Sequence, residues 1–238
     1  MAARALVLVH LEQDGVGTLG EWLPAAGLDL EVRRLHEGDP VPEVLPPGFD
    51  ALVVMGGAMG VGDVDRLPWL REEMDLIRRT TAAGTPVLGV CLGAQLLAAA
   101  TGGRVERGRF GPEVGATVVQ LTDRAAADPL FSEVGALAEV VQWHWDGIVE
   151  LPPGAVLLAG SGAYPHQAFR VGERAWGVQF HIETTPGILA RWAEHDAATL
   201  AADGLDAAEA QAGAAALTPV LERTWRPVVA RFARLAAS

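Results

Sequence analysis

Three short apolar runs, each of strand length and each followed by a helical pattern, constrain the fold of this chain more than any other feature. They span residues 5–10, 51–55 and 86–90. Continuous apolar runs, unlike alternating ones, are typical of strands that are buried on both faces of a parallel sheet. Residues 28–35 alternate as a further strand, and helical patterns over 18–26 and 68–83 are each closed by a glycine. The pattern predicts an α/β fold with helices on both faces of a parallel sheet.

The second half of the chain has a different sequence pattern, in which short predicted strands are separated by turns rich in proline and glycine. We expect these to be antiparallel strands added to the parallel core, over residues 117–121, 140–143, 156–159, 167–171 and 175–180. Two terminal helices are predicted over 186–201 and about 205–236, with interruptions in the second at Gly213 and Pro219. We therefore predict one domain over residues 1–238, with a C-terminal helical extension over about 204–236.

The charge composition of the chain indicates which classes of binding partner are expected. The chain has 18 basic and 30 acidic residues, so its formal net charge is −12, and the short cluster of Arg104, Arg107 and Arg109 does not reverse that. Nucleic acid and anionic membranes are therefore not expected partners. All the basic residues are arginine, and the chain has no asparagine. This excludes a P-loop lysine, Schiff-base chemistry on lysine, and N-glycosylation.

One cysteine, Cys91, cannot form an internal disulfide, and the N-terminus lacks the pattern of a secretory signal. No apolar run reaches the length of a membrane helix, so a cytoplasmic protein is expected. The histidines outside the motifs below, at positions 10, 36, 166 and 195, are too scattered to suggest a ligand set. We therefore predict no metal site.

A glycine-rich segment follows the first predicted strand, and it raises the possibility of a dinucleotide site. Gly15-Val16-Gly17-Thr18-Leu19-Gly20 matches G-x-G-x-x-G. In a Rossmann turn the first glycine follows the strand almost at once, whereas residues 11–14 intervene here. A plain turn is therefore the better interpretation.

The predicted strand over 86–90 runs into Gly89-Val90-Cys91-Leu92-Gly93, and a helical run over 94–100 follows. This is the pattern of a nucleophile elbow with cysteine in place of serine. The glycines permit a sharp turn between strand and helix, and the helix N-terminus stabilises a thiolate. A single cysteine at the end of a buried strand is otherwise more often inert. With the flanking glycines, a nucleophile is the favoured interpretation.

A thiol nucleophile requires a base and a group that orients the base. His181-Ile182-Glu183 supplies both at the end of the apolar strand predicted over 175–180. Two residues apart in extended chain, the imidazole and the carboxylate lie on the same side, so Glu183 could hold the tautomer of the ring. The alternative is that Glu183 caps the following helix beside a histidine at a strand end.

Together these motifs resemble those of the class I glutamine amidotransferases, and within them the glutaminase domain of GMP synthase. The resemblance covers about residues 1–200 and is carried by Gly89-Val90-Cys91-Leu92-Gly93-Ala94-Gln95-Leu96-Leu97 with Thr101-Gly102-Gly103, by Trp176-Gly177-Val178-Gln179-Phe180-His181-Ile182-Glu183, and by Val54-Met55-Gly56-Gly57-Ala58-Met59. The chain departs from the usual motifs at Ile182 and Ala58, where the family commonly has proline.

The resemblance implies a three-layer, flavodoxin-like α/β fold with a mostly parallel central sheet. It also implies that Cys91 is the nucleophile, that His181 is the general base and acid, and that Glu183 orients the imidazole. The backbone N–H groups of Gly57 and Leu92 would form the oxyanion hole.

Further residues are implied as substrate contacts, namely Gln95, Met59, His144 and Trp145. The last two belong to Trp143-His144-Trp145-Asp146, which lies where the family has a loop that contacts the amino acid portion of the substrate. The alternative is that this tryptophan-rich strand end is part of the core.

The implied chemistry is hydrolysis of the side-chain amide of glutamine through a γ-glutamyl thioester, with no metal or organic cofactor. Three interpretations stay open. The chain could be a glutaminase subunit that passes ammonia to a synthase, or a stand-alone amidotransferase-like enzyme, since the sequence lacks the nucleotide-activating region that accompanies this domain in GMP synthase. It could instead be a γ-glutamyl hydrolase or peptidase with the same triad. The third is a non-catalytic binding or regulatory protein, which the intact triad disfavours.

Overall fold

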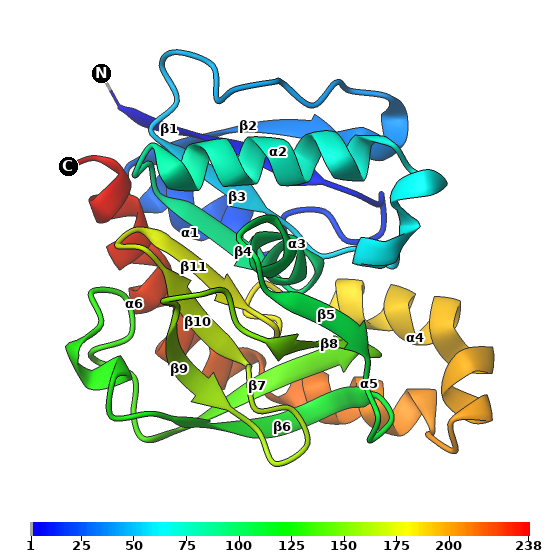
Figure 1. Cartoon of the computed structure of the whole chain (residues 1–238). Coiled ribbons are helices and arrows are strands. Elements are labelled where there is room, and N and C mark those ends of the chain that lie inside the picture. Colours follow the sequence, from blue (N-terminus) through cyan, green and yellow to red (C-terminus); the bar gives the residue numbers. More distant parts are fainter. Residues whose placement is uncertain (1) are drawn as a thin grey trace.

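A computed structural model describes residues 2–238. Within these residues, nine strands form one sheet in the order β2-β1-β3-β4-β11-β10-β9-β6-β7 (Figure 1). The strands are β1 (Ala3–Val9), β2 (Leu28–Arg34), β3 (Ala51–Val54), β4 (Val87–Val90), β6 (Glu113–Leu121), β7 (Leu137–His144), β9 (Val156–Gly160), β10 (Ala168–Val171) and β11 (Ala175–Val178). The three apolar runs predicted as buried strands correspond to β1, β3 and β4.

The sheet is parallel in its first half and antiparallel in its second. Strands β2, β1, β3, β4 and β11 pair in parallel, and the antiparallel pairings begin between β11 and β10. The expectation that the strand near 175–180 is antiparallel to the core was therefore wrong for its pairing with β4. All four residues of β11 are buried, which is the pattern of a central parallel strand.

Two strands were not predicted from the sequence. β5 (Arg104–Arg107) and β8 (Asp146–Glu150) form a separate antiparallel pair. Three of the four residues of β5 are exposed and charged, so this strand lacks both the apolar run and the alternation that indicate a strand.

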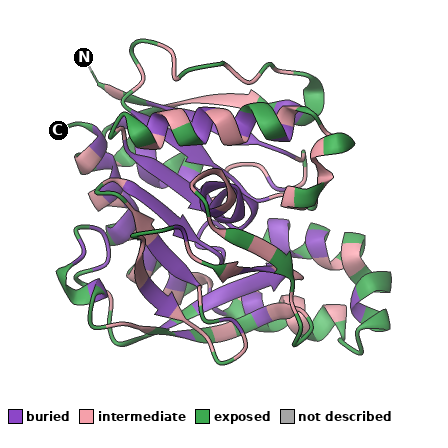
Figure 2. Cartoon of the chain, in the orientation of Figure 1, coloured by how far each residue is buried: buried purple, intermediate pink, exposed green. Residues whose placement is uncertain are grey.

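Helices cover both faces of the sheet, and the alternation of side chains along β1 separates two cores. Val7 packs with the residues of α1 (Leu19–Ala25) and α6 (Thr218–Ala236). Leu6 and Leu8 point the other way and pack with α2 (Trp69–Ala82) and α3 (Leu92–Ala100). Figure 2 shows the buried sheet between these two layers of helices. This is a three-layer α/β fold.

The C-terminal part contains α4 (Pro186–Ala202) and α5 (Ala207–Ala216) before α6. The side chains of Thr185 and Asp206 accept backbone N–H bonds at the starts of α4 and α5 respectively. The predicted interruption at Gly213 was wrong, because this glycine lies inside α5; the chain breaks at Leu217 instead. Pro219 lies in the first turn of α6, where its missing N–H is tolerated.

In the described part of the chain, three short 3-10 helices connect these elements, namely η1 (Leu35–Glu37), η2 (Val61–Asp65) and η3 (Ala125–Ala127). Among residues 2–238, no helix is both long enough and apolar enough to cross a membrane. The carboxyl ends of β1, β3, β4 and β11 meet at one edge of the sheet, because these strands are parallel. In open α/β sheets this edge is where ligands bind.

Candidate active site

Cys91 lies in the turn between β4 and α3, in a backbone conformation that L-residues rarely adopt. Its φ is 50° and its ψ is −105°, and no other non-glycine residue among 2–238 has a positive φ. Such outliers persist where the surrounding structure enforces them, and they cluster at functional sites. The turn therefore has the conformation expected of a nucleophile elbow.

The flanking glycines are required by close packing. A Cβ atom on Gly89 would lie 2.5 Å from the carbonyl carbon of Gly93, and one on Gly93 would lie 2.1 Å from the oxygen of Val54. Any side chain at either position would overlap the backbone of a neighbour. These contacts let α3 begin directly above the sheet, with Cys91 at its N-terminus.

The thiol of Cys91 is mostly buried and has a polar neighbour. Gln179 donates a side-chain N–H toward the sulfur at 3.7 Å, and it accepts an N–H bond from Gln95 at 3.2 Å. Gln95 also donates to the backbone oxygen of Asp146 at 3.1 Å. Gln95 therefore connects the nucleophile turn with the segment that follows β7.

His181 and Glu183 follow β11 and are both buried. Nδ1 of His181 donates to Oε1 of Glu183 at 2.7 Å. Burial lowers the pKa of His181, but the Glu183 carboxylate and the nearby Cys91 sulfur outweigh it, so this pKa is raised well above 6.5. The other ring nitrogen, Nε2, has no hydrogen-bond partner among residues 2–238.

Gly56, two residues after β3, lies against the side chains of Cys91 and His181. A Cβ atom built on Gly56 would be 3.2 Å from Cε1 of His181 and 3.6 Å from Cβ of Cys91. The imidazole and the thiol therefore approach each other beside the Gly56 backbone. The side chains of Cys91, His181 and Glu183 therefore come together from the ends of the adjacent parallel strands β4 and β11, which is the arrangement that a nucleophile, a base and an orienting group would require.

Gly57 and Leu92, the residues predicted to form the oxyanion hole, also contact each other. A Cβ atom on Gly57 would be 2.9 Å from Cδ2 of Leu92 and 2.6 Å from the sulfur of Met59. Neither the Gly57 amide nor the Leu92 amide donates a hydrogen bond to another group in the described residues. Free amides beside Cys91 are what an oxyanion hole at this residue would require.

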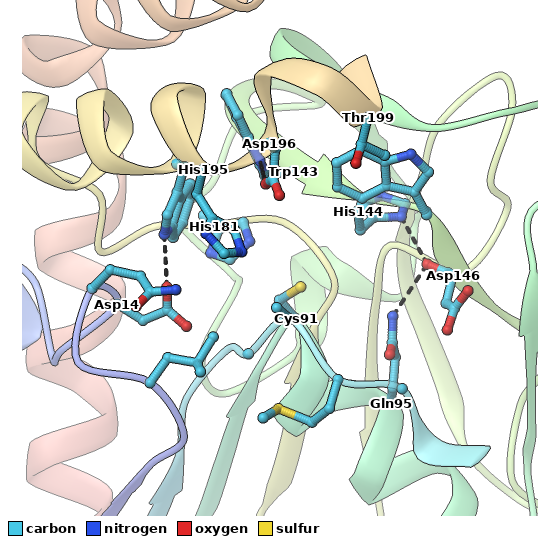
Figure 3. Close-up of a pocket in the computed structure, with 18 of the residues that line it drawn as sticks. Asp14, Cys91, Gln95, Trp143, His144, Asp146, His181, His195, Asp196 and Thr199 are labelled. Carbon is cyan, nitrogen blue, oxygen red and sulfur yellow. Dashed lines mark hydrogen bonds between the residues drawn. The ribbon is translucent and has the colours of Figure 1, made fainter. Parts of the chain in front are cut away.

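These residues surround a cavity of about 340 Å³ (Figure 3). Cys91 and His181 line it, together with residues that the sequence predicts as oxyanion or substrate contacts, namely Gly57, Met59, Gln95, His144 and Trp145. Glu183 and Leu92 are not on its wall: Glu183 lies behind His181, and Leu92 would contribute only its backbone N–H.

One side of the cavity was not foreseen from the sequence. Trp192, His195, Asp196 and Thr199 of α4 line it, and Asp14 faces them from the loop after β1. The spacing of the α4 residues, at i, i+3, i+4 and i+7, is that of one helix face and was the available signal.

Two indole groups hold the carboxylates of this wall. The Nε1 of Trp192 donates to Asp14 at 2.7 Å, and the Nε1 of Trp143 donates to Asp196 at 2.8 Å. Burial raises the pKa of Asp14. Among residues 2–238 no group of three or more His, Cys, Asp or Glu residues could hold a metal ion.

The glycine-rich segment Gly15 to Gly20 ends the loop after β1 and enters α1, whose first residue is Leu19. Gly15 and Gly17 have φ of 59° and 52°, which favours glycine at both positions. The amide of Thr18 donates to the backbone oxygen of Glu183 at 2.9 Å. The segment therefore packs beneath the His181–Glu183 pair.

Comparison with known proteins gives one family. The model of the family described as glutamine amidotransferase class-I matches residues 21–192. The chain is 30% identical to the glutamine amidotransferase-like protein YfeJ of Salmonella typhimurium, over 83% of each chain. Its structure resembles the crystal structure of a glutamine amidotransferase from Thermotoga maritima, with a TM-score of 0.86 over 98% of this chain and 99% of that one. The two sequences are 28% identical.

Two further relatives have more specific names. The chain is 32% identical to gamma-glutamyl peptidase 4 of Arabidopsis thaliana, over 51% of this chain and 49% of the peptidase. It is 34% identical to a glutamine-hydrolysing GMP synthase of Thermotoga maritima, over 65% of this chain and 30% of the synthase. The matched region therefore spans less than a third of the synthase and about half of the peptidase.

Proposed function

The chain belongs to the class I glutamine amidotransferase family, and from this premise we propose that it is a cysteine-dependent amide hydrolase acting on glutamine. Cys91 is the nucleophile in this proposal, His181 the general base and acid, and Glu183 the group that orients the imidazole. One observation carries the proposal most strongly. Cys91, strained at φ of 50°, lies beside the imidazole of His181, which is hydrogen-bonded to Glu183 at 2.7 Å and whose Nε2 has no partner within the described residues.

The first half of the reaction forms a thioester. His181 takes the thiol proton, and the Cys91 sulfur attacks the side-chain carbonyl carbon of glutamine. The backbone N–H groups of Gly57 and Leu92 stabilise the resulting oxyanion. When the tetrahedral intermediate collapses, the C–N bond breaks and His181 donates its proton to the departing ammonia.

The second half regenerates the enzyme. His181 removes a proton from water, and the resulting hydroxide attacks the thioester carbon. The C–S bond then breaks, glutamate leaves, and the proton on His181 returns to the Cys91 sulfur. Glu183 accepts the hydrogen bond from Nδ1–H of His181 throughout, which keeps Nε2 facing the reacting atoms and stabilises the imidazolium.

The remaining wall of the cavity would bind the amino acid portion of the substrate. Gln95, Met59, His144 and Trp145 are the proposed contacts, because each lines the cavity beside the nucleophile. His144 is held by its own Nδ1, which donates to the backbone oxygen of Asp146 at 2.8 Å. A synthase subunit that accepts the ammonia is a further part of this proposal, motivated by the similarity to GMP synthase.

A γ-glutamyl hydrolase or peptidase is the second candidate. The observation that favours it is the extent of the cavity, which continues from the strand ends to Trp192, Asp196 and Thr199 of α4. A compound with a larger amine than ammonia could use this space, and one relative is named gamma-glutamyl peptidase. The same triad would then release an amine instead of ammonia.

The decisive experiment is steady-state turnover of glutamine and a panel of γ-glutamyl amides and dipeptides, with ammonia and amine release measured separately. Cys91→Ala and His181→Ala serve as controls for background hydrolysis. Fast release from glutamine supports the first candidate, and fast amine release with slow glutamine turnover supports the second. If the wild-type rate equals that of Cys91→Ala on every compound, the proposal of an amide hydrolase fails.

A further inference from the structure

His10, at the carboxyl end of β1, is completely buried between an acidic side chain and the backbone of the active-site loop. Its Nε2 lies 2.9 Å and 3.1 Å from the two carboxylate oxygens of Glu73, which extends from α2 and is equally buried. Its Nδ1 lies 2.8 Å from the carbonyl oxygen of Gly56. The ring also stacks on Trp69, with 5.6 Å between centroids and 14° between planes.

The partners of His10 decide its protonation state. A backbone carbonyl only accepts hydrogen bonds, so Nδ1 of His10 donates to the Gly56 oxygen. Opposite an ionised Glu73 carboxylate, Nε2 donates as well, and the ring is then an imidazolium. In agreement, burial lowers the pKa of His10 but is outweighed by Glu73 and by the bond to Gly56, and the net shift is upward. A charged donor of this kind makes a strong hydrogen bond to the Gly56 carbonyl.

The Gly56 carbonyl and the Gly57 N–H belong to one peptide unit. No peptide bond among residues 2–238 is cis, so this unit is planar and its C=O and N–H point in opposite directions. Glycine on both sides leaves the unit free to rotate, because neither residue restricts φ and ψ as a side chain would. Something other than local sterics must therefore set the direction of the Gly57 N–H.

We propose that His10, held by Glu73, is a positioning residue that fixes the Gly56–Gly57 peptide so that the Gly57 N–H is directed at the oxyanion. This inference rests on the proposed function, because it assigns a role in the same reaction. His10 touches neither substrate nor Cys91 in this role. It acts through the peptide, by holding the oxygen on the side away from the cavity.

Two double variants separate the bond to Gly56 from the bond to Glu73. The side-chain nitrogen of asparagine stands at the δ position, like Nδ1 of histidine, whereas that of glutamine stands at the ε position, like Nε2. His10→Asn with Glu73→Gln therefore keeps a donor for the Gly56 oxygen. His10→Gln with Glu73→Gln removes it. In both double variants the two replaced side chains are uncharged, and the variants differ from each other only by one methylene group at position 10. Each double variant is therefore the matched control of the other.

The expected result is a selective loss of turnover in the glutamine pair. For His10→Gln with Glu73→Gln we expect kcat to fall about 10- to 100-fold with little change in KM, because an oxyanion donor is misdirected. The asparagine pair is expected to recover most of the wild-type kcat. Alkylation of Cys91 by iodoacetamide forms no oxyanion, so its rate should match wild type in both pairs, which shows that the thiol and His181 are undisturbed.

Three outcomes would overturn the inference. They are wild-type kcat in both pairs, an equal loss in both pairs, or a loss of alkylation that parallels the loss of turnover. Crystal structures of the two pairs give a readout that needs no turnover: the Gly56 oxygen should keep its position in the asparagine pair and move in the glutamine pair. If the wild type hydrolyses none of the compounds, the proposed function fails. The position of the Gly56 oxygen in the two crystal structures still decides whether His10 fixes the Gly56–Gly57 peptide.

Discussion

The backbone of Gly17 packs against the carbonyl oxygen of Glu183, and no side chain fits between them. A Cβ atom on Gly17 would lie 2.0 Å from that oxygen and 3.1 Å from Cγ of Glu183. Gly17 comes from the turn between β1 and α1, whereas Glu183 follows β11. The turn therefore supports, from below, the carboxylate that binds His181 at 2.7 Å.

Gly17→Ala should disturb both stability and turnover. The added methyl group overlaps the backbone of Glu183, and a forced shift of this kind typically costs about 1–3 kcal/mol of unfolding free energy. Because Glu183 moves, we expect kcat to fall about tenfold or more. The measurements are denaturant unfolding and steady-state kinetics on whichever compound the wild type turns over fastest.

Gly15→Ala is the matched control for this variant. Gly15 has a similar φ of 59°, but a Cβ atom there would meet nothing within 4 Å. It therefore carries the same backbone strain without the contact to Glu183. Equal kcat values for the two variants would show that the packing of Gly17 on Glu183 has no effect on the reaction.

Replacement of the proposed base and its orienting group should give losses of different size. His181→Ala removes the group that transfers the proton, so we expect a loss of about 10²–10⁴-fold in kcat. Glu183→Gln keeps an oxygen that can accept the hydrogen bond from Nδ1–H but loses the charge that stabilises the imidazolium, so the fall in kcat should be smaller than for His181→Ala. Rates are compared across neutral pH. A His181→Ala variant as active as wild type contradicts the proposed mechanism.

The parallel core and the elbow could be predicted from the sequence because their signals are local. Each apolar run of strand length is followed closely in the sequence by a helical pattern. The glycines that permit the turn at Cys91 are within two residues of it. Hydrophobic pattern alone does not indicate that His181 and Gly57 lie near this turn. That expectation came from the resemblance of the motifs to those of the family.

Contacts between distant segments could not be predicted in this way. Asp14 accepts its hydrogen bond from Trp192, 178 residues further along the chain, and His10 pairs with Glu73, 63 residues away. Each residue alone is an ordinary polar side chain next to a strand or on a helix. Their pairing is visible only when the order of strands and the faces of the helices are known.

The strained backbone at Cys91 predicts a gain in stability when the side chain is removed. A non-glycine residue held at φ of 50° and ψ of −105° costs about 1–3 kcal/mol, and glycine adopts such angles freely. Glycine also has a more flexible unfolded state, which offsets about 0.4–1 kcal/mol of this. We therefore expect Cys91→Gly to be more stable than Cys91→Ala by about 1 kcal/mol, although both should be inactive. Unfolding by urea measures the difference, and an alanine variant that is the more stable would show that the turn is not strained.

The buried pair of His10 and Glu73 should make stability depend on pH in a defined direction. The pKa of His10 is raised in the folded protein, whereas in the unfolded chain it returns to about 6.5. Below this unfolded value the imidazolium exists in both states, so its stabilising contribution is complete; it is lost as the pH rises through the higher, folded pKa. The pair His10→Asn with Glu73→Gln carries no titrating group at these positions. The unfolding free energy of the wild type minus that of this pair should therefore be largest near about pH 6 and decrease toward alkaline pH. Asp14 lies near enough to contribute to the same shift, so the comparison is repeated in an Asp14→Asn background. A difference that increases as the pH rises would mean that His10 is neutral in the folded protein and donates to only one of its two partners.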